Sequence, residues 1–111
     1  MPTITINDLF PAFVGELSRL VSEAGHPHLS EQIPSLPVVA RCNCAQDNCA
    51  HFYTAPPPRG AYPPNHTNIL LPTDDGLIVV DVIEDRIVAV EILDRPDVKQ
   101  LLDKALPVVA A

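Results

Sequence analysis

Two apolar segments near the C-terminus, Leu77–Ile83 and Arg86–Leu93, constrain the fold most strongly. β-branched residues dominate both segments, and only Glu84 and Asp85 separate them. Short runs of this composition on either side of an acidic dipeptide are typical of two strands joined by a tight turn. We therefore predict an antiparallel hairpin in which Ile83 pairs with Arg86.

That register sorts the hairpin side chains into two predicted faces. The first face consists of Leu77, Val79, Asp81, Ile83, Arg86, Val88, Val90 and Ile92. The second face consists of Ile78, Val80, Val82, Ile87, Ala89, Glu91 and Leu93. Both faces are largely apolar, whereas a sheet with one solvent-exposed face alternates more clearly. We expect both faces to be covered, and because two helices are few for that task, we expect a homodimer that buries part of one face.

Two other segments have helical periodicity. Residues 7–25 repeat apolar side chains at steps of three and four, with Asn7 or Asp8 as the expected cap. Residues 96–106 repeat them more briefly, with Asp94 as the expected cap. These segments predict one N-terminal helix and one short C-terminal helix.

Residues 38–44, 49–54 and 68–71 are predicted to form three more strands. Together with the hairpin and the helices they predict an α+β fold. Its expected form is a mainly antiparallel sheet of about five strands with an N-terminal helix and a short C-terminal helix. We find no internal repeat or linker, so residues 1–111 are expected to form a single domain.

Two proline-containing connections complete the chain. Residues 26–28 and 33–37 are expected to form an irregular connection that runs extended, because proline disfavours helix in the residue before it. Residues 55–66 favour polyproline II and cannot join the interior of a sheet. This second stretch is expected to be a stiff surface connector. The alternative is a recognition loop for a protein partner, with Arg59 and Tyr62 making the contacts.

A cluster of potential metal ligands lies between the predicted elements. All three cysteines, Cys42, Cys44 and Cys49, occur in a run of eight residues, and His51 follows closely. The polar loop 45–48 is typical of a turn between two strands. Pairing the strands across it places Cys44 opposite Cys49, and Cys42 opposite His51. Because side chains two residues apart share a face of a strand, all four project from one side of this second hairpin, formed by residues 38–54.

Three thiolates and one imidazole form a Cys₃His set, which is typical of structural zinc sites. The set also accepts iron or cobalt. The fourth ligand is open, since His26, His28 or His66 would serve in place of His51.

Other interpretations of the cysteines remain open. In the first of these, the cysteines are ordinary core residues, because Cys packs as a small hydrophobe. Alternatively, Cys44 and Cys49 form a disulfide. In an enzymatic interpretation, either Cys49 is a thiolate nucleophile beside His51, or three thiolates hold an open metal site with Asp47 as general base.

Charge and hydrophobicity indicate which partners and which cellular location are expected. The formal net charge is −7 and the pI is about 4.7, so a general nucleic-acid or anionic-membrane surface is not expected. The N-terminus lacks the basic and apolar pattern of a signal peptide, and no apolar run is long enough to cross a bilayer. We expect a cytoplasmic protein with reduced thiols.

Two segments resemble short bacterial proteins of unknown function. Residues 76–94 contain a strand, an acidic turn and the strand Arg-Ile-Val-Ala-Val-Glu-Ile-Leu. They resemble a family whose second strand reads R-I-V-G-I-E-I-L, with Ala89 in place of the usual glycine. Residues 42–54 resemble a C-x-C-x₄-C element followed by a Phe-Tyr-Thr strand, with Ala45 where such loops often carry glycine. Neither resemblance implies an activity.

The sequence therefore predicts a small cytoplasmic, zinc-stabilised binding or regulatory module without evident catalytic residues. Two alternatives remain: a small metal- or thiol-dependent enzyme, and a metal-free structural or oligomeric protein with core cysteines.

Overall fold

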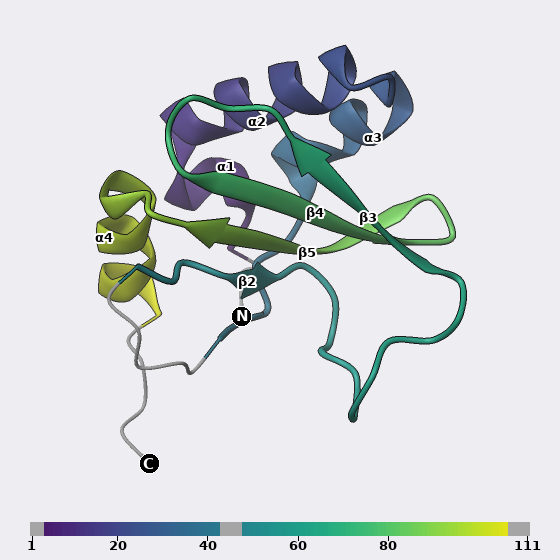
Figure 1. The fold of residues 1–111 in the computed structure, drawn as a ribbon. Helices are drawn as coiled ribbons and strands as arrows, with labels where there is room; N and C mark the ends of the chain where they lie inside the picture. Colours follow the sequence, from purple (N-terminus) through teal and green to yellow (C-terminus); the bar gives the residue numbers. More distant parts are fainter. Residues whose placement is uncertain (1–3, 43–47, 107–111) are drawn as a thin grey trace.

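A five-stranded antiparallel sheet with the strand order β1-β2-β5-β4-β3 organises the protein (Figure 1). The computed structural model describes residues 4–42 and 48–106. The strands are β1 (Ala40–Arg41), β2 (Phe52–Tyr53), β3 (His66–Leu71), β4 (Leu77–Ile83) and β5 (Arg86–Leu93). The helices are α1 (Ile6–Leu9), α2 (Pro11–Glu23), α3 (Pro27–Gln32), the 3₁₀ turn η1 (Ile33–Ser35) and α4 (Pro96–Ala105). The predicted α+β class and strand number are confirmed.

The N-terminal helical region differs from the prediction of a single helix. The helix breaks at Phe10 (φ −134°, ψ 59°), because Pro11 disfavours helical geometry in the preceding residue and itself begins α2. The cap of α1 is Thr5, whose hydroxyl accepts from the Asp8 N–H while the Asp8 carboxylate accepts from the Thr5 N–H. The predicted cap at Asn7 or Asp8 is therefore wrong by two or three positions.

Two other local predictions are also wrong. The expected extended segment after His26 is helical, because Pro27 occupies the first position of α3, where its missing N–H costs nothing. The expected cap of α4, Asp94, instead adopts a left-handed conformation (φ 61°), and Arg95 takes the capping position. The strands around the cysteines are shorter than expected, whereas β3 begins two residues earlier, at His66.

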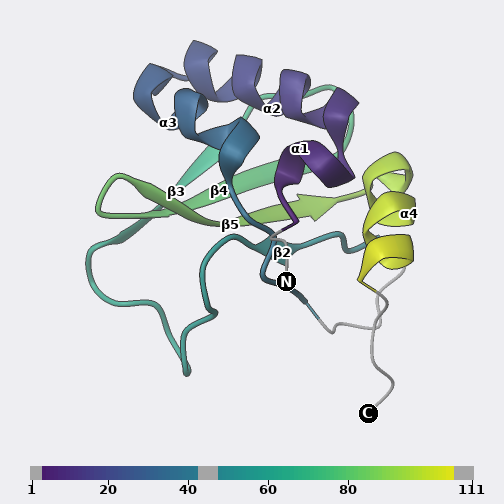
Figure 2. The same cartoon turned by 180° about the vertical axis from the view of Figure 1, so that it is seen from behind.

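Helices α1, α2 and α3 pack on one face of the sheet, and α4 lies at one end of it (Figures 1 and 2). The core between these layers combines Leu17 and Val21 of α2 and Phe10, between α1 and α2, with Phe52 and Val80 of the sheet. No helix in the described ranges has the length and hydrophobicity needed to cross a membrane.

The other face of the sheet is partly open. Leu70 and Leu77 are 64% and 40% exposed, although both lie in strands. The expected coverage of both faces is therefore incomplete in the single chain. The homodimer that would bury part of this face stays a prediction.

A β-bulge between β4 and β5 decides which side chains reach the open face. Asp81 pairs with Ala89 while Val82 pairs with Ile87, so Val88 is an extra residue in β5. An extra residue reverses the alternation of every side chain beyond it. The predicted faces are therefore wrong from Ala89 onward, and Glu91 lies on the same face as Asp81.

Candidate metal centre and adjacent cavity

Two short strands bring part of the predicted ligand set together. Strands β1 and β2 pair antiparallel, and beyond them the Cys42 N–H donates to the His51 carbonyl at 3.0 Å. Cys42 therefore lies opposite His51. Cys49 forms an isolated bridge with Leu93 of β5, which fixes it beside the sheet. The potential ligand atoms of Cys42, Cys49 and His51 all lie within 4.8 Å of one another.

This spacing is close to that of a tetrahedral zinc site. Zinc bonds to sulfur and nitrogen of ordinary length place the ligand atoms about 3.4–3.8 Å apart. The three groups would need to move together by about 1 Å to hold an ion. Rotation about χ1 displaces a Cys Sγ atom or a His ring by at least this distance.

The burial of these groups and the protonation of His51 fit metal binding. Cys49 is 2% exposed, whereas Cys42 is half-buried. Nε2 of His51 is buried and has no hydrogen-bond partner among the residues that the structure describes. Burial lowers the pKa of His51, and the negative charge of Asp81 partly opposes this change. The imidazole is therefore held neutral, which is the form that binds metal.

The fate of the other predicted ligands differs from residue to residue. Cys44 lies outside the described residues, and so do the predicted base Asp47 and most of the loop between the cysteines. His26 and His28 lie at α3, on the helical side of the sheet, where His28 Nε2 is 3.6 Å from Asp85 Oδ1. His66 is hydrogen-bonded to Asp81. None of these three histidines joins the cluster of Cys42, Cys49 and His51.

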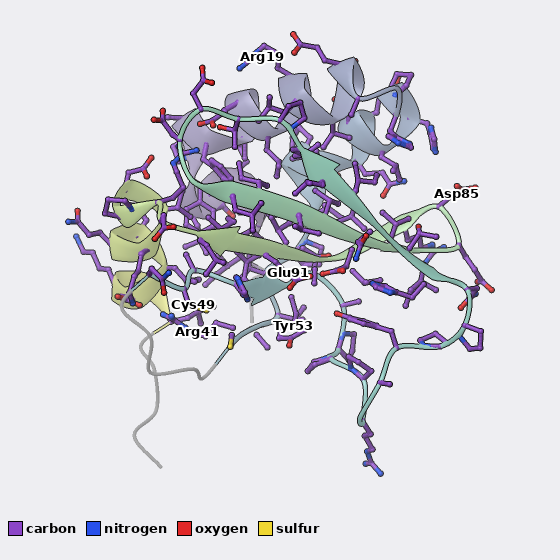
Figure 3. All side chains as sticks on the ribbon, viewed as in Figure 1. Arg19, Arg41, Cys49, Tyr53, Asp85 and Glu91 are labelled. Atoms are coloured by element: carbon purple, nitrogen blue, oxygen red, sulfur yellow. The ribbon has the colours of Figure 1, made fainter. Side chains whose placement is uncertain are left out.

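A cavity of about 100 Å³ adjoins this cluster, and His51 belongs to both. Figure 3 shows Tyr53, Glu91 and Cys49 on the same side of the sheet. The cavity is lined by His51, by residues of β2, β4 and β5, and by one residue of the proline-rich connection: His51, Phe52, Tyr53, Tyr62, Asp81, Ala89, Val90 and Glu91.

Two acids at the cavity share an unusual environment. Asp81 is 1% exposed, and its Oδ1 accepts a hydrogen bond from Nε2 of His66 at 2.8 Å. A hydrogen bond with Asp81 is the main cause that raises the pKa of Glu91 to about 7, and burial adds to it. The negative charge of Asp81 acts in the same direction, and His66 opposes it.

Tyr62 attaches the proline-rich connection to this acidic pair. Its ring stacks on the His66 imidazole, with centroids 4.2 Å apart and planes 7° from parallel. Burial raises the pKa of Tyr62 to about 12, so the phenol stays protonated at neutral pH. Arg59, the other residue considered as a contact, is exposed.

Sequence reasoning missed Asp81 and Glu91 as site residues because the predicted register placed them on opposite faces. The signal that marks them is a single acid within each otherwise apolar strand. A buried acid requires a partner, so such residues point to a polar site within a sheet.

No family model matches the chain, and neither the curated proteins nor the solved structures contain a match. The resemblance of residues 42–54 and 76–94 to short bacterial proteins therefore stays a prediction.

Proposed function

We propose that Cys42, Cys49 and His51 bind a zinc ion, with Cys44 as the fourth ligand, and that the protein is a zinc-stabilised binding or regulatory module of the cytoplasm. The observation that carries this proposal is the convergence of three ligand atoms to within 4.8 Å. A reducing compartment suits it, because thiols that are kept reduced remain available to metal.

The strand geometry gives the metal a structural task. Strands β1 and β2 are each two residues long, and β1 is the edge strand next to β2 among the strands that the structure describes. Pairing this short provides few hydrogen bonds, and a two-stranded ribbon is marginal in water. An ion shared by Cys42 before the loop and by Cys49 and His51 after it would close the loop and stabilise this edge of the sheet.

A metal-free core explains the same residues less well. Without a metal, the buried Nε2 of His51 lacks a hydrogen-bond partner among the described residues, which costs about 1–3 kcal/mol. Cys42 is only half-buried, so apolar packing explains it poorly.

A metal-dependent enzyme is the second candidate, because His51 lines both the ligand cluster and a cavity that contains Glu91. An open site would hold the ion through Cys42, Cys49 and His51 alone and leave a position for water. The variant Cys44→Ser separates the two candidates. A structural four-ligand site loses most of its zinc affinity in this variant, whereas an open three-ligand site retains it.

The proposal is tested by thermal unfolding with and without a strong chelator. We expect the chelator to lower Tm of the wild type and to have no effect on His51→Ala, which has already lost a ligand. His28→Ala is the matched control, since it removes an exposed imidazole on α3 and should respond to the chelator as the wild type does. An unchanged wild-type Tm in the presence of the chelator would refute the metal site.

A further inference from the structure

We propose that the cavity between β2, β4, β5 and Tyr62 binds a guanidinium group, carried either by a small molecule or by an arginine side chain of a peptide. This inference goes beyond the proposed zinc site. It rests on the residues of the cavity and not on the presence of metal.

The acidic pair supplies the charge that such a ligand requires. Asp81 and Glu91 both line the cavity, and they lie on the same face of the sheet, because Asp81 pairs with Ala89 and Glu91 pairs with Val79. Two carboxylates in contact need either a proton or a cation to compensate them. His66 already donates to one oxygen of Asp81, so a ligand with several N–H donors would find the remaining acceptor positions.

The aromatic walls favour a flat cation over a metal ion. Tyr53 and Tyr62 line the same cavity as the acids. Guanidinium is planar, forms paired hydrogen bonds with carboxylates and stacks on aromatic faces, whereas ammonium acts as a compact point charge. Among the described residues, the only set of three or more His, Cys, Asp and Glu side chains spaced for a metal ion is the Cys42, Cys49 and His51 cluster, which excludes Asp81 and Glu91.

The size of the cavity and the charge around it agree with this ligand. A volume of about 100 Å³ is sufficient for a small planar group such as guanidinium. A neighbouring zinc ion would not repel the ligand, because its two positive charges are balanced by the thiolates that hold it. The chain as a whole carries a formal charge of −7.

The two tyrosines make the proposal measurable in the intact protein. The chain has two tyrosines and no tryptophan, and both tyrosines line the cavity. Tyrosine fluorescence therefore reports on this site alone. The titrant is N-methylguanidinium chloride up to about 50 mM, well below the molar concentrations at which guanidinium unfolds proteins. Urea provides the neutral isostere, methylammonium chloride the compact cation and sodium chloride the ionic-strength control.

We expect a saturable change with N-methylguanidinium, none with urea or sodium chloride, and at least severalfold weaker binding of methylammonium. Glu91→Gln should weaken binding about tenfold by removing one charge-assisted partner. Glu31→Gln makes the same change of charge at an exposed position on α3 and should bind as the wild type does. A wild type that does not respond, equal responses to urea or methylammonium, or unchanged affinity in Glu91→Gln would each overturn the proposal.

A second set of titrations, with short peptides, identifies the source of the guanidinium group. A blocked Gly-Arg-Gly peptide is titrated against Gly-Lys-Gly, and the affinities are compared with that of N-methylguanidinium. Tighter binding of the arginine peptide supports a protein partner, whereas weaker binding supports a small guanidino compound. Zinc content is measured in the same samples. Saturable binding by protein that holds no zinc would contradict the proposed metal function and leave this inference standing.

Discussion

Replacing Glu91 with Gln should change how the stability of the protein depends on pH. The hydrogen bond with Asp81 and burial raise the pKa of Glu91 from 4.5 to about 7. The folded protein therefore favours the protonated acid, while the unfolded chain ionises it near pH 4.5. Stability associated with Glu91 is fully present below pH 4.5, falls as the pH rises through about 7, and is constant above that value. Glutamine imitates the protonated acid at every pH, because its amide N–H can donate to Asp81.

The structure sets the size of the effect. A rise in pKa from 4.5 to about 7 corresponds to about 3 kcal/mol if the acid is fully shielded from water. Glu91 is only half-buried, so solvent screening reduces this figure, and we expect about 1–2 kcal/mol. In a domain of this size such a difference shifts Tm by about 4–10 °C.

The assay is urea unfolding followed by circular dichroism at pH 5, 6, 7 and 8. We expect the wild type to lose about 1–2 kcal/mol relative to Glu91→Gln between pH 5 and pH 8. Glu31→Gln controls for the change in net charge. Parallel curves for the wild type and Glu91→Gln, or a variant that is less stable than the wild type at pH 8, would refute the reasoning.

Two further predictions concern positions away from the site. Arg95 donates two hydrogen bonds to Glu16 at 2.7 and 2.8 Å while itself buried, so Arg95→Ala should lower the free energy of unfolding by about 2–4 kcal/mol in urea titration; a loss below about 0.5 kcal/mol would contradict this. Gly76 has φ +76°, and a Cβ there would lie 2.3 Å from the Leu93 carbonyl oxygen. Gly76→Ala should therefore lower the free energy of unfolding by more than about 1 kcal/mol, whereas Gly15→Ala, in an open part of α2, should raise it by about 0.5–1 kcal/mol. Equal effects of the two substitutions on thermal unfolding would show that the backbone contact at Gly76 does not destabilise Gly76→Ala.

The elements that could be predicted are those in which local composition and tertiary packing agree. Strands β4 and β5 begin and end where expected, because β-branched residues fill both and an acidic dipeptide separates them. The break at Phe10 and the helix that begins at Pro27 were predictable in principle, since proline at the first helical position begins a helix as readily as it ends one. The sequence prediction instead continued one helix through Pro11 and expected an extended segment around Pro27.

The two parts of the site differ in how far the neighbouring sequence determines their geometry. Cys42, Cys49 and His51 converge through one short strand pairing, so sequence spacing alone predicts their proximity. The placement of Asp81 and Glu91 on one face depends on the extra residue Val88, and nothing in the apolar stretch Ile87–Val90 marks where the bulge falls. Tyr62 reaches the cavity through the long connection before β3, and His66 at the start of β3 contacts Asp81 and Tyr62. No local sequence pattern specifies either position.

The central claim is tested most directly by the zinc content per chain, measured by elemental mass spectrometry. The protein is purified without chelators and without a metal-binding tag, and it is compared with His51→Ala and His28→Ala. The account predicts about one zinc per chain in the wild type and in His28→Ala, and little in His51→Ala. Wild-type protein without metal, or the same zinc content in all three proteins, would contradict it.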